Sequence, residues 1–207
     1  MNILCLNTAF STAYLALKTD KKSFFREVDA EAKSSEKVLP EVEKILLEAD
    51  ISPKDLDVCA VVIGPGSFTG IRIGVAIAKG FSVCFEKLKF IAINSLDLMA
   101  FAFFEKNNFD GEFYAVQNAL SNRFFISKYS HSKPLLKAEM VNILPENSFL
   151  VGLESENLDG MNAKISPNAE DLLILSLKKL EEENFVSSDE LEPLYIRLAQ
   201  AEENLKR

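Results

Sequence analysis

The segment VCAVVIGPGSFTGIRIGVAIAKGF, residues 58–81, joins an apolar run to a second apolar stretch through a turn rich in glycine. An apolar run without alternation is typical of a strand in the middle of a parallel sheet, where both faces are covered. The turn places serine and threonine where a helix would begin, and these residues are common helix caps. We therefore predict a strand, a glycine loop and a helix, which together indicate an α/β fold.

The flanking segments extend this unit in both directions. Residues 3–17 are typical of a β-hairpin, residues 23–30 of a third strand, and residues 37–50 of a helix. Residues 90–94 predict a strand and residues 95–106 a helix. A second unit then begins near residue 107 and repeats the plan of strand, polar turn and strand. We expect two subdomains with mixed sheets, 1–106 and 107–207, with the C-terminal tail free to pack back on the first.

The glycine loop resembles a phosphate site, but it lacks the residues that complete one. A P-loop has a lysine after its last glycine, whereas Ile71 follows Gly70 here. The dinucleotide pattern would require glycine in place of Thr69. Amide groups at the helix start could still hold an anion, and Arg72 is within reach. The sequence therefore predicts an incomplete phosphate site.

The predicted helix after the loop carries a line of small residues at every fourth position. Such a line permits very close packing, either against the protein's own sheet or against the helix of another subunit. Glycine inside a helix costs about 0.5–1 kcal/mol relative to alanine, so close packing must compensate. The spacing alone leaves both alternatives open. The line and its neighbours are Gly70, Ile71, Gly74, Val75, Ala78 and Ser82.

Composition limits the chemistry of the chain. It has one histidine, His131, and three separated cysteines in apolar surroundings, which argues against a metal cluster or a histidine-assisted nucleophile. The net charge of -8, mainly due to the second half, disfavours direct binding of nucleic acid. Asn7 and Asn118 follow the first strand of each unit, and an amide cannot act as a base. No apolar run is long enough for a membrane span.

Five segments together resemble the TsaB (YeaZ) family of bacterial tRNA-modification proteins. They are MNILCLNTAFSTAYLAL, SSEKVLPEVEKILLEA, VVIGPGSFTGIRIGVAIAKGF, AINSLDLMA and PLYIR, and they cover most of the first hundred residues and one late motif. The loop is the most specific of them. Its family residues here are Gly64, Pro65, Gly66, Ser67, Phe68, Thr69 and Arg72.

The resemblance implies a catalytically degenerate fold of the actin/Hsp70-like, ribonuclease H-like class. It also implies a cytoplasmic, non-catalytic scaffold for TsaD, the related subunit that transfers a threonylcarbamoyl group to tRNA adenosine. The small ATPase TsaE would join the pair, tRNA would be bound only through the complex, and a homodimer is the alternative in isolation. No cofactor is expected in this chain alone, although a nucleotide could occupy the subunit boundary.

In the family, the partner surface involves two helices. Carried over to this sequence, it comprises Val38, Leu39, Val42, Ile45 and Leu46, together with Gly70, Ile71, Gly74, Val75, Ala78 and Ser82. On this basis we expect the line of small residues to face a partner. An active ATPase or small-molecule kinase of the same fold is the alternative function, and a peptidase is a third. The family's usual acidic residue is replaced by Asn7, which disfavours the ATPase or kinase, and the single histidine disfavours the peptidase.

Overall fold

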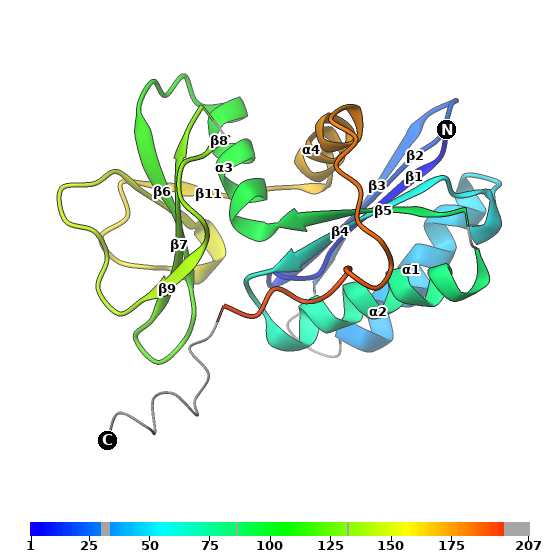
Figure 1. The fold of residues 1–207 in the computed structure, drawn as a ribbon, viewed down its shortest axis with the longest axis horizontal. Coiled ribbons are helices and arrows are strands. Elements are labelled where there is room, and N and C mark those ends of the chain that lie inside the picture. Colours follow the sequence, from blue (N-terminus) through cyan, green and yellow to red (C-terminus); the bar gives the residue numbers. More distant parts are fainter. Residues whose placement is uncertain (30–33, 86, 132, 197–207) are drawn as a thin grey trace.

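The chain folds into two lobes, each built on its own sheet (Figure 1). The structure, a computed structural model, describes residues 1–29, 34–85, 87–131 and 133–196. The first sheet has the order β3-β2-β1-β4-β5. Its strands are β1 (Ile3–Asn7), β2 (Thr12–Lys18), β3 (Ser23–Asp29), β4 (Val58–Gly64) and β5 (Lys89–Asn94).

The pairing within this sheet explains the sequence pattern. Strand β2 is antiparallel to β1 and β3, whereas β4 is parallel to both β1 and β5. Because β4 lies in the interior of the sheet with both faces covered, its residues are apolar without alternation. The sheet is therefore mixed, as expected, with β2 as the one antiparallel strand between β3 and β1.

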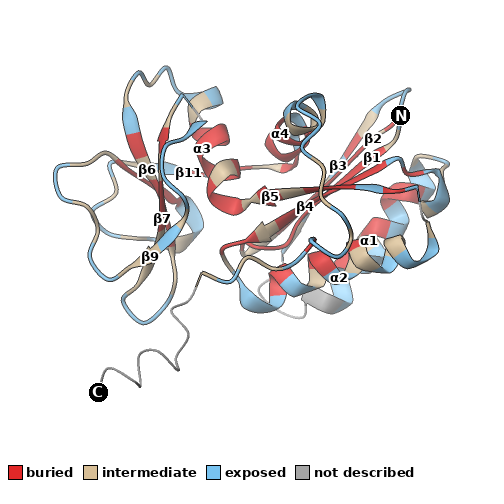
Figure 2. Cartoon of the chain, viewed as in Figure 1, coloured by how far each residue is buried: buried red, intermediate tan, exposed pale blue. Residues whose placement is uncertain are grey.

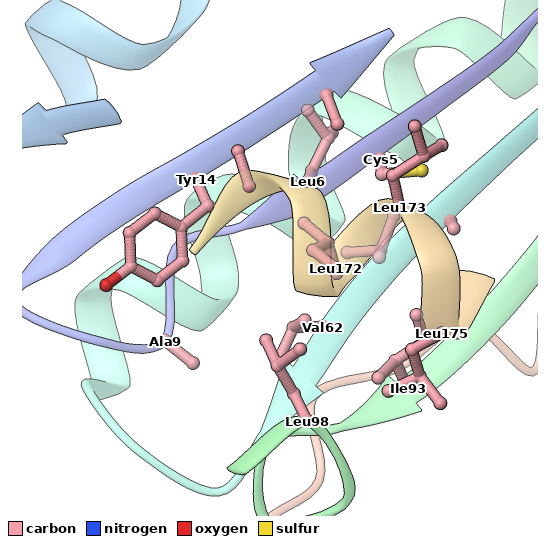
Figure 3. Close-up of a cluster of buried hydrophobic side chains, with 14 of the residues drawn as sticks. Cys5, Leu6, Ala9, Tyr14, Val62, Ile93, Leu98, Leu172, Leu173 and Leu175 are labelled. Carbon is pink, nitrogen blue, oxygen red and sulfur yellow. The ribbon is translucent and has the colours of Figure 1, made fainter. Parts of the chain in front are cut away.

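Helices cover both faces of the first sheet (Figure 1). Helices α1 (Ser34–Glu48) and α2 (Phe68–Cys84) lie on one face, and α4 (Ala169–Glu181) lies on the other. Figure 3 shows Leu172, Leu173 and Leu175 of α4 directed at Cys5, Val62 and Ile93 of the sheet. Residues after 107 thus return to complete the first lobe, because α4 packs mainly on β1 and β2.

The second lobe holds the order β11-β10-β6-β7-β8, with β9 also paired to β7. Helix α3 (Ser95–Lys106) connects the lobes and is almost entirely buried (Figure 2). The hairpin predicted after residue 112 is present as β6 and β7. The strands are β6 (Glu112–Asn118), β7 (Phe124–Ser130), β8 (Lys133–Pro134), β9 (Glu139–Val141), β10 (Leu150–Leu153) and β11 (Ala163–Ile165), and short helices lie at Pro53–Asp55 (η1) and Glu154–Glu156 (η2).

The last described segment, residues 182–196, runs back along the first lobe. The amide of Val186 donates to the carbonyl of Phe90 at 3.0 Å, and the amide of Leu194 donates to the carbonyl of Ile63 at 2.8 Å. Leu191, which lies between Val186 and Leu194 in the sequence, is fully buried. The segment is therefore fastened to β4 and β5. The expected behaviour of the tail beyond residue 196 lies outside the described residues.

Candidate functional site

The glycine loop is held against the turn of the first hairpin. Gly64 and Gly66 have φ values of 115° and 146°, in the region that favours glycine. The amide of Ser67 donates to the carbonyl of Ala9 at 2.9 Å, and a Cβ on Gly66 would lie 2.4 Å from that same oxygen. Ser67 also caps α2, because its hydroxyl accepts from the amide of Gly70 at 3.2 Å, as the sequence predicts. The loop thus needs its glycines for close backbone contact.

The line of small residues on α2 faces the protein's own sheet. A Cβ on Gly70 would lie 1.9 Å from the carbonyl oxygen of Thr8, and one on Gly74 would lie 2.6 Å from the hydroxyl of Thr8. That hydroxyl donates to the carbonyl of Gly70 at 2.6 Å. Ala78 is fully buried as well. The expectation that these small residues face a partner is therefore wrong, because Thr8, directly after β1, and Val61 of β4 already occupy the space that Gly70 and Gly74 leave.

Most of the other residues assigned to the partner surface are also buried within this chain. On α1, Leu39 alone of the five is exposed, with 44% of its surface accessible. Ser82 is half-buried, and its hydroxyl donates to the carbonyl of Lys79 at 2.8 Å. The buried members are Val38, Val42, Ile45, Leu46, Gly70, Ile71, Gly74, Val75 and Ala78.

A different set of residues forms the outer surface of α1 and α2, which pack beside each other. On α2, Ala76, Gly80 and Val83 are exposed, and a Cβ on Gly80 would meet nothing within 4 Å. Leu39 and Leu47 are exposed on α1, and Val83 and Leu47 show 84% and 80% of their surfaces. We call these five residues the outer helix face. Figure 2 shows exposed segments along the outer sides of both helices.

A cleft of about 550 Å³ lies between the two lobes. The glycine loop and the turn of the first hairpin form one wall, and the β6–β7 turn and η2 form the other. Leu194, Tyr195 and Ile196 of the returning segment also line it. The remaining lining residues include Phe10, Ser11, Phe68, Gln117, Leu120, Phe125, Leu153 and Glu156.

Glu156 is the acidic group of the cleft. Burial raises the pKa of its carboxyl to about 7, although hydrogen bonds from the Asn118 amide and the Gln117 side chain oppose this shift. The Asn118 amide donates to Oε2 of Glu156 at 2.7 Å. A carboxyl with such a pKa changes its charge near neutral pH, which is a feature of functional sites. Sequence analysis missed Glu156 because it lies in a polar, acidic stretch that resembles a solvated loop.

A hydrogen-bonded chain links Gln117 to the glycine loop. The hydroxyl of Ser95, which is fully buried, lies within hydrogen-bond distance of both the Pro65 carbonyl and, at 3.2 Å, Oε1 of Gln117. Gln117 is itself buried. Since Gln117 also bonds Glu156, the two walls of the cleft are connected through polar side chains. The spacing of residues 65, 95, 117 and 156 along the chain gives no indication that they lie together in the fold.

The guanidinium of Arg72 is held by aromatic residues and is not available for the phosphate contact that its position in the sequence suggested. Its guanidinium lies 3.7 Å above the ring centroid of Phe68, and its Nε donates to the hydroxyl of Tyr195 at 2.8 Å. Tyr195 in turn packs on Phe68, with ring centroids 5.7 Å apart. Arg72 is not among the residues that line the cleft. The late PLYIR motif and the glycine loop therefore support each other across the first lobe.

The candidates for catalysis do not come together. Asn7 is fully buried, its Oδ1 accepts from the amide of Ala9, and its Nδ2 has no hydrogen-bond partner among the described residues. Asn118 uses its side chain to accept from the amide of Leu120. Among the residues that the structure describes, no three acidic, histidine or cysteine side chains are grouped to hold a metal ion. Burial raises the pKa of the Cys5 thiol to about 12, so it is not a nucleophile at neutral pH.

Known proteins resemble this chain along most of its length. A family described as "TsaD: tRNA N6-adenosine threonylcarbamoyltransferase" matches residues 28–123. The tRNA threonylcarbamoyladenosine biosynthesis protein TsaB of Haemophilus influenzae is 25% identical, over 95% of this chain and 94% of its own length. The TsaB protein of Escherichia coli is 26% identical, over 95% of both chains. The resemblance to TsaB is confirmed.

Solved structures give the same result for the fold. YeaZ from Pseudomonas aeruginosa superimposes with a TM-score of 0.76 at 20% identity, over 94% of this chain and 99% of its own. Another Pseudomonas aeruginosa protein, described as similar to the peptidase YeaZ, reaches 0.79 at 20% identity, over 95% and 99% of the two chains. The predicted two-sheet α/β fold is therefore confirmed. Within the described part of the chain, no helix is both long and apolar enough to cross a bilayer.

Proposed function

We propose that this chain is a non-catalytic subunit in the biosynthesis of threonylcarbamoyladenosine in tRNA, and that it binds and supports a TsaD-like transferase. Two relatives that match nearly the whole chain are TsaB proteins of this pathway. The observation that carries the proposal is the outer helix face, an apolar surface on α1 and α2 that no described segment of the chain covers.

The outer helix face has the form of a helix-packing surface. Ala76 and Gly80 are one turn apart on α2 and give it a shallow centre, where the backbone of another helix can approach closely. Val83 on the same helix, and Leu39 and Leu47 on the neighbouring α1, add exposed apolar side chains that a partner would bury. Burying apolar area contributes about 25 cal/mol per Å², so a few such side chains supply a useful part of the binding free energy.

The proposed mechanism is a shift in the conformation of the partner. A subunit that binds only the active arrangement of a transferase increases the population of that arrangement, without providing a reacting group. TsaE-like protein and tRNA would join through the resulting complex in the cytoplasm, and a nucleotide could bind at the subunit boundary. In isolation the same outer helix face could pair two copies of this chain. An ATPase or kinase activity has no specific observation in its favour.

We expect a charge on the outer helix face to weaken binding of the TsaD protein from the same organism. Leu39→Asp and Val83→Asp each place a carboxylate where an apolar contact is proposed, and we expect each to cost about 1–2 kcal/mol, or roughly five- to thirtyfold in Kd. The measurement is a calorimetric titration of TsaD with each variant, together with a thermal unfolding curve of the isolated chain.

Leu135→Asp is the matched control. Leu135 is exposed to a similar extent as Leu39, 47% against 44%, but it lies on the second lobe. Its variant should bind TsaD like the natural chain. If all three variants bind equally well, the outer helix face is not the partner surface.

A further inference from the structure

The cleft between the lobes has the size of a small-molecule site but not the charge of a phosphate site. Its volume of about 550 Å³ lies within the range of ligand pockets, which is roughly 300–1,000 Å³. Among the described residues that line it, Glu156 alone has an acidic or basic side chain that changes charge between pH 6 and pH 8. A phosphate group would therefore meet a carboxyl and no lysine, arginine or histidine of the lining.

The start of α2 supplies only a partial positive charge to this cleft. A helix N-terminus is equivalent to about half a unit charge, and the Gly70 amide is already satisfied by Ser67. The guanidinium of Arg72 is engaged by Phe68 and Tyr195. The full negative charge of an ionised Glu156 therefore exceeds the positive charge that the lining provides, and the cleft favours a cation over an anion.

The rest of the lining suits the body of an organic molecule. Phe10, Phe68, Phe125, Leu120 and Leu153 contribute apolar or aromatic surface, and Ser11 and Ser155 add hydroxyl groups. Residues of both lobes and of the returning C-terminal segment line the cleft. A ligand here would touch the glycine loop and η2 at once and would thereby hold the two lobes together.

We propose that the cleft binds a small primary amine with an apolar or aromatic body, and that the Glu156 carboxylate pairs with its ammonium group. The Gln117 side chain and the Asn118 amide orient this carboxyl, because both lie at the end of β6 and both form hydrogen bonds with it. The inference concerns the isolated chain and is independent of the outer helix face.

The pairing makes amine binding depend on pH. Burial raises the pKa of Glu156 to about 7, so roughly a tenth of the carboxyl is ionised at pH 6 and most of it at pH 8. Of the charged groups near η2, Glu154 accepts from the hydroxyl of Ser166 and Lys164 donates to Asn157. An amine that stays protonated throughout should therefore bind about five- to tenfold more tightly at pH 8 than at pH 6.

The test uses three probes: phenethylamine and phenylacetate, which differ mainly in charge, and ADP as a phosphate-bearing anion. Each is titrated into the isolated chain at pH 6 and pH 8, and binding is followed by the NMR resonances of residues that line the cleft. We expect phenethylamine to bind and to shift these resonances, and we expect phenylacetate and ADP to bind at least tenfold more weakly. Equal or tighter binding of the anions, or no binding of the amine at either pH, would overturn the proposal.

Two neighbouring acids provide the variant and its control. Glu156→Gln should weaken the binding of phenethylamine at least tenfold at pH 8 and remove the pH dependence of this binding. Glu154→Gln should leave the affinity for phenethylamine and its pH dependence unchanged, because Glu154 does not line the cleft. Thermal unfolding of both variants establishes that they are folded. Amine binding that survives Glu156→Gln with the same pH dependence would also refute the assignment, whereas neither outcome bears on TsaD binding.

Discussion

Gly70→Ala should destabilise the chain by about 3 kcal/mol or more, the largest loss that we expect from adding a single methyl group. The new Cβ would lie 1.9 Å from the carbonyl oxygen of Thr8 and 3.1 Å from its carbon, and these are backbone atoms that cannot rotate away. The helix would have to move off β1 and give up the Thr8 hydrogen bond to the Gly70 carbonyl. Overpacking of this kind typically costs 1–3 kcal/mol, and a rigid neighbour raises the cost. Chemical denaturation measures the change.

Gly80→Ala on the same helix is the control, and it should have the opposite effect. A Cβ on Gly80 meets nothing within 4 Å, so alanine gains its helix propensity of about 1 kcal/mol without a steric cost. Equal effects of the two variants would contradict the packing of α2 described here. A Gly70→Ala chain with natural stability but impaired TsaD binding would restore the view that the small residues face a partner.

The sequence predicted the order of the elements in the first lobe. The apolar run of β4, the helix after the glycine loop and the hairpin of β1 and β2 each have a strong local signal, and each is present. These signals work because burial on both faces or on one face sets the residue pattern directly. The same reasoning gave the class of the fold before any tertiary contact was known.

The side of α2 that packs on the sheet could not be predicted, because small and apolar residues lie on both sides of the helix. Gly70, Gly74 and Ala78 mark the inner side, and Ala76 and Gly80 mark the outer side. Spacing by four identifies a line but does not say which neighbour occupies it. The deciding atoms belong to Thr8, which is 62 residues away from Gly70 in the chain.

Glu156 could not be predicted either, for a different reason. Its burial depends on η2 approaching the end of β6, and no local pattern encodes that contact. In the sequence Glu156 stands near Glu154 and Asp159, which makes a solvated surface the natural interpretation. The structure separates these acids, because burial raises the pKa of Glu156 while Glu154 is exposed and bonded to Ser166.

Glu156 should make the folded state less stable as the pH rises through the range from about 4.5 to 7. The ordinary pKa of a glutamate carboxyl is 4.5, and that of Glu156 in the folded chain is about 7, so the folded state binds more protons within this window. Stability therefore falls with increasing pH until Glu156 is ionised in both states, and then it levels off. A shift of this size corresponds to about 3 kcal/mol.

Glu156→Gln isolates this contribution, because glutamine cannot lose a proton and keeps a similar shape. Denaturant unfolding at pH 5 should show little difference between the variant and the natural chain. At pH 8 the variant should be more stable by up to about 3 kcal/mol, less whatever the carboxylate's two hydrogen bonds contribute. Glu154→Gln should follow the natural chain at both values, since Glu154 is exposed and its replacement leaves Glu156 in place. If the Glu156→Gln and natural chains differ by the same amount at pH 5 and pH 8, the carboxyl does not titrate near neutrality, and the burial of η2 against β6 is looser than the structure indicates.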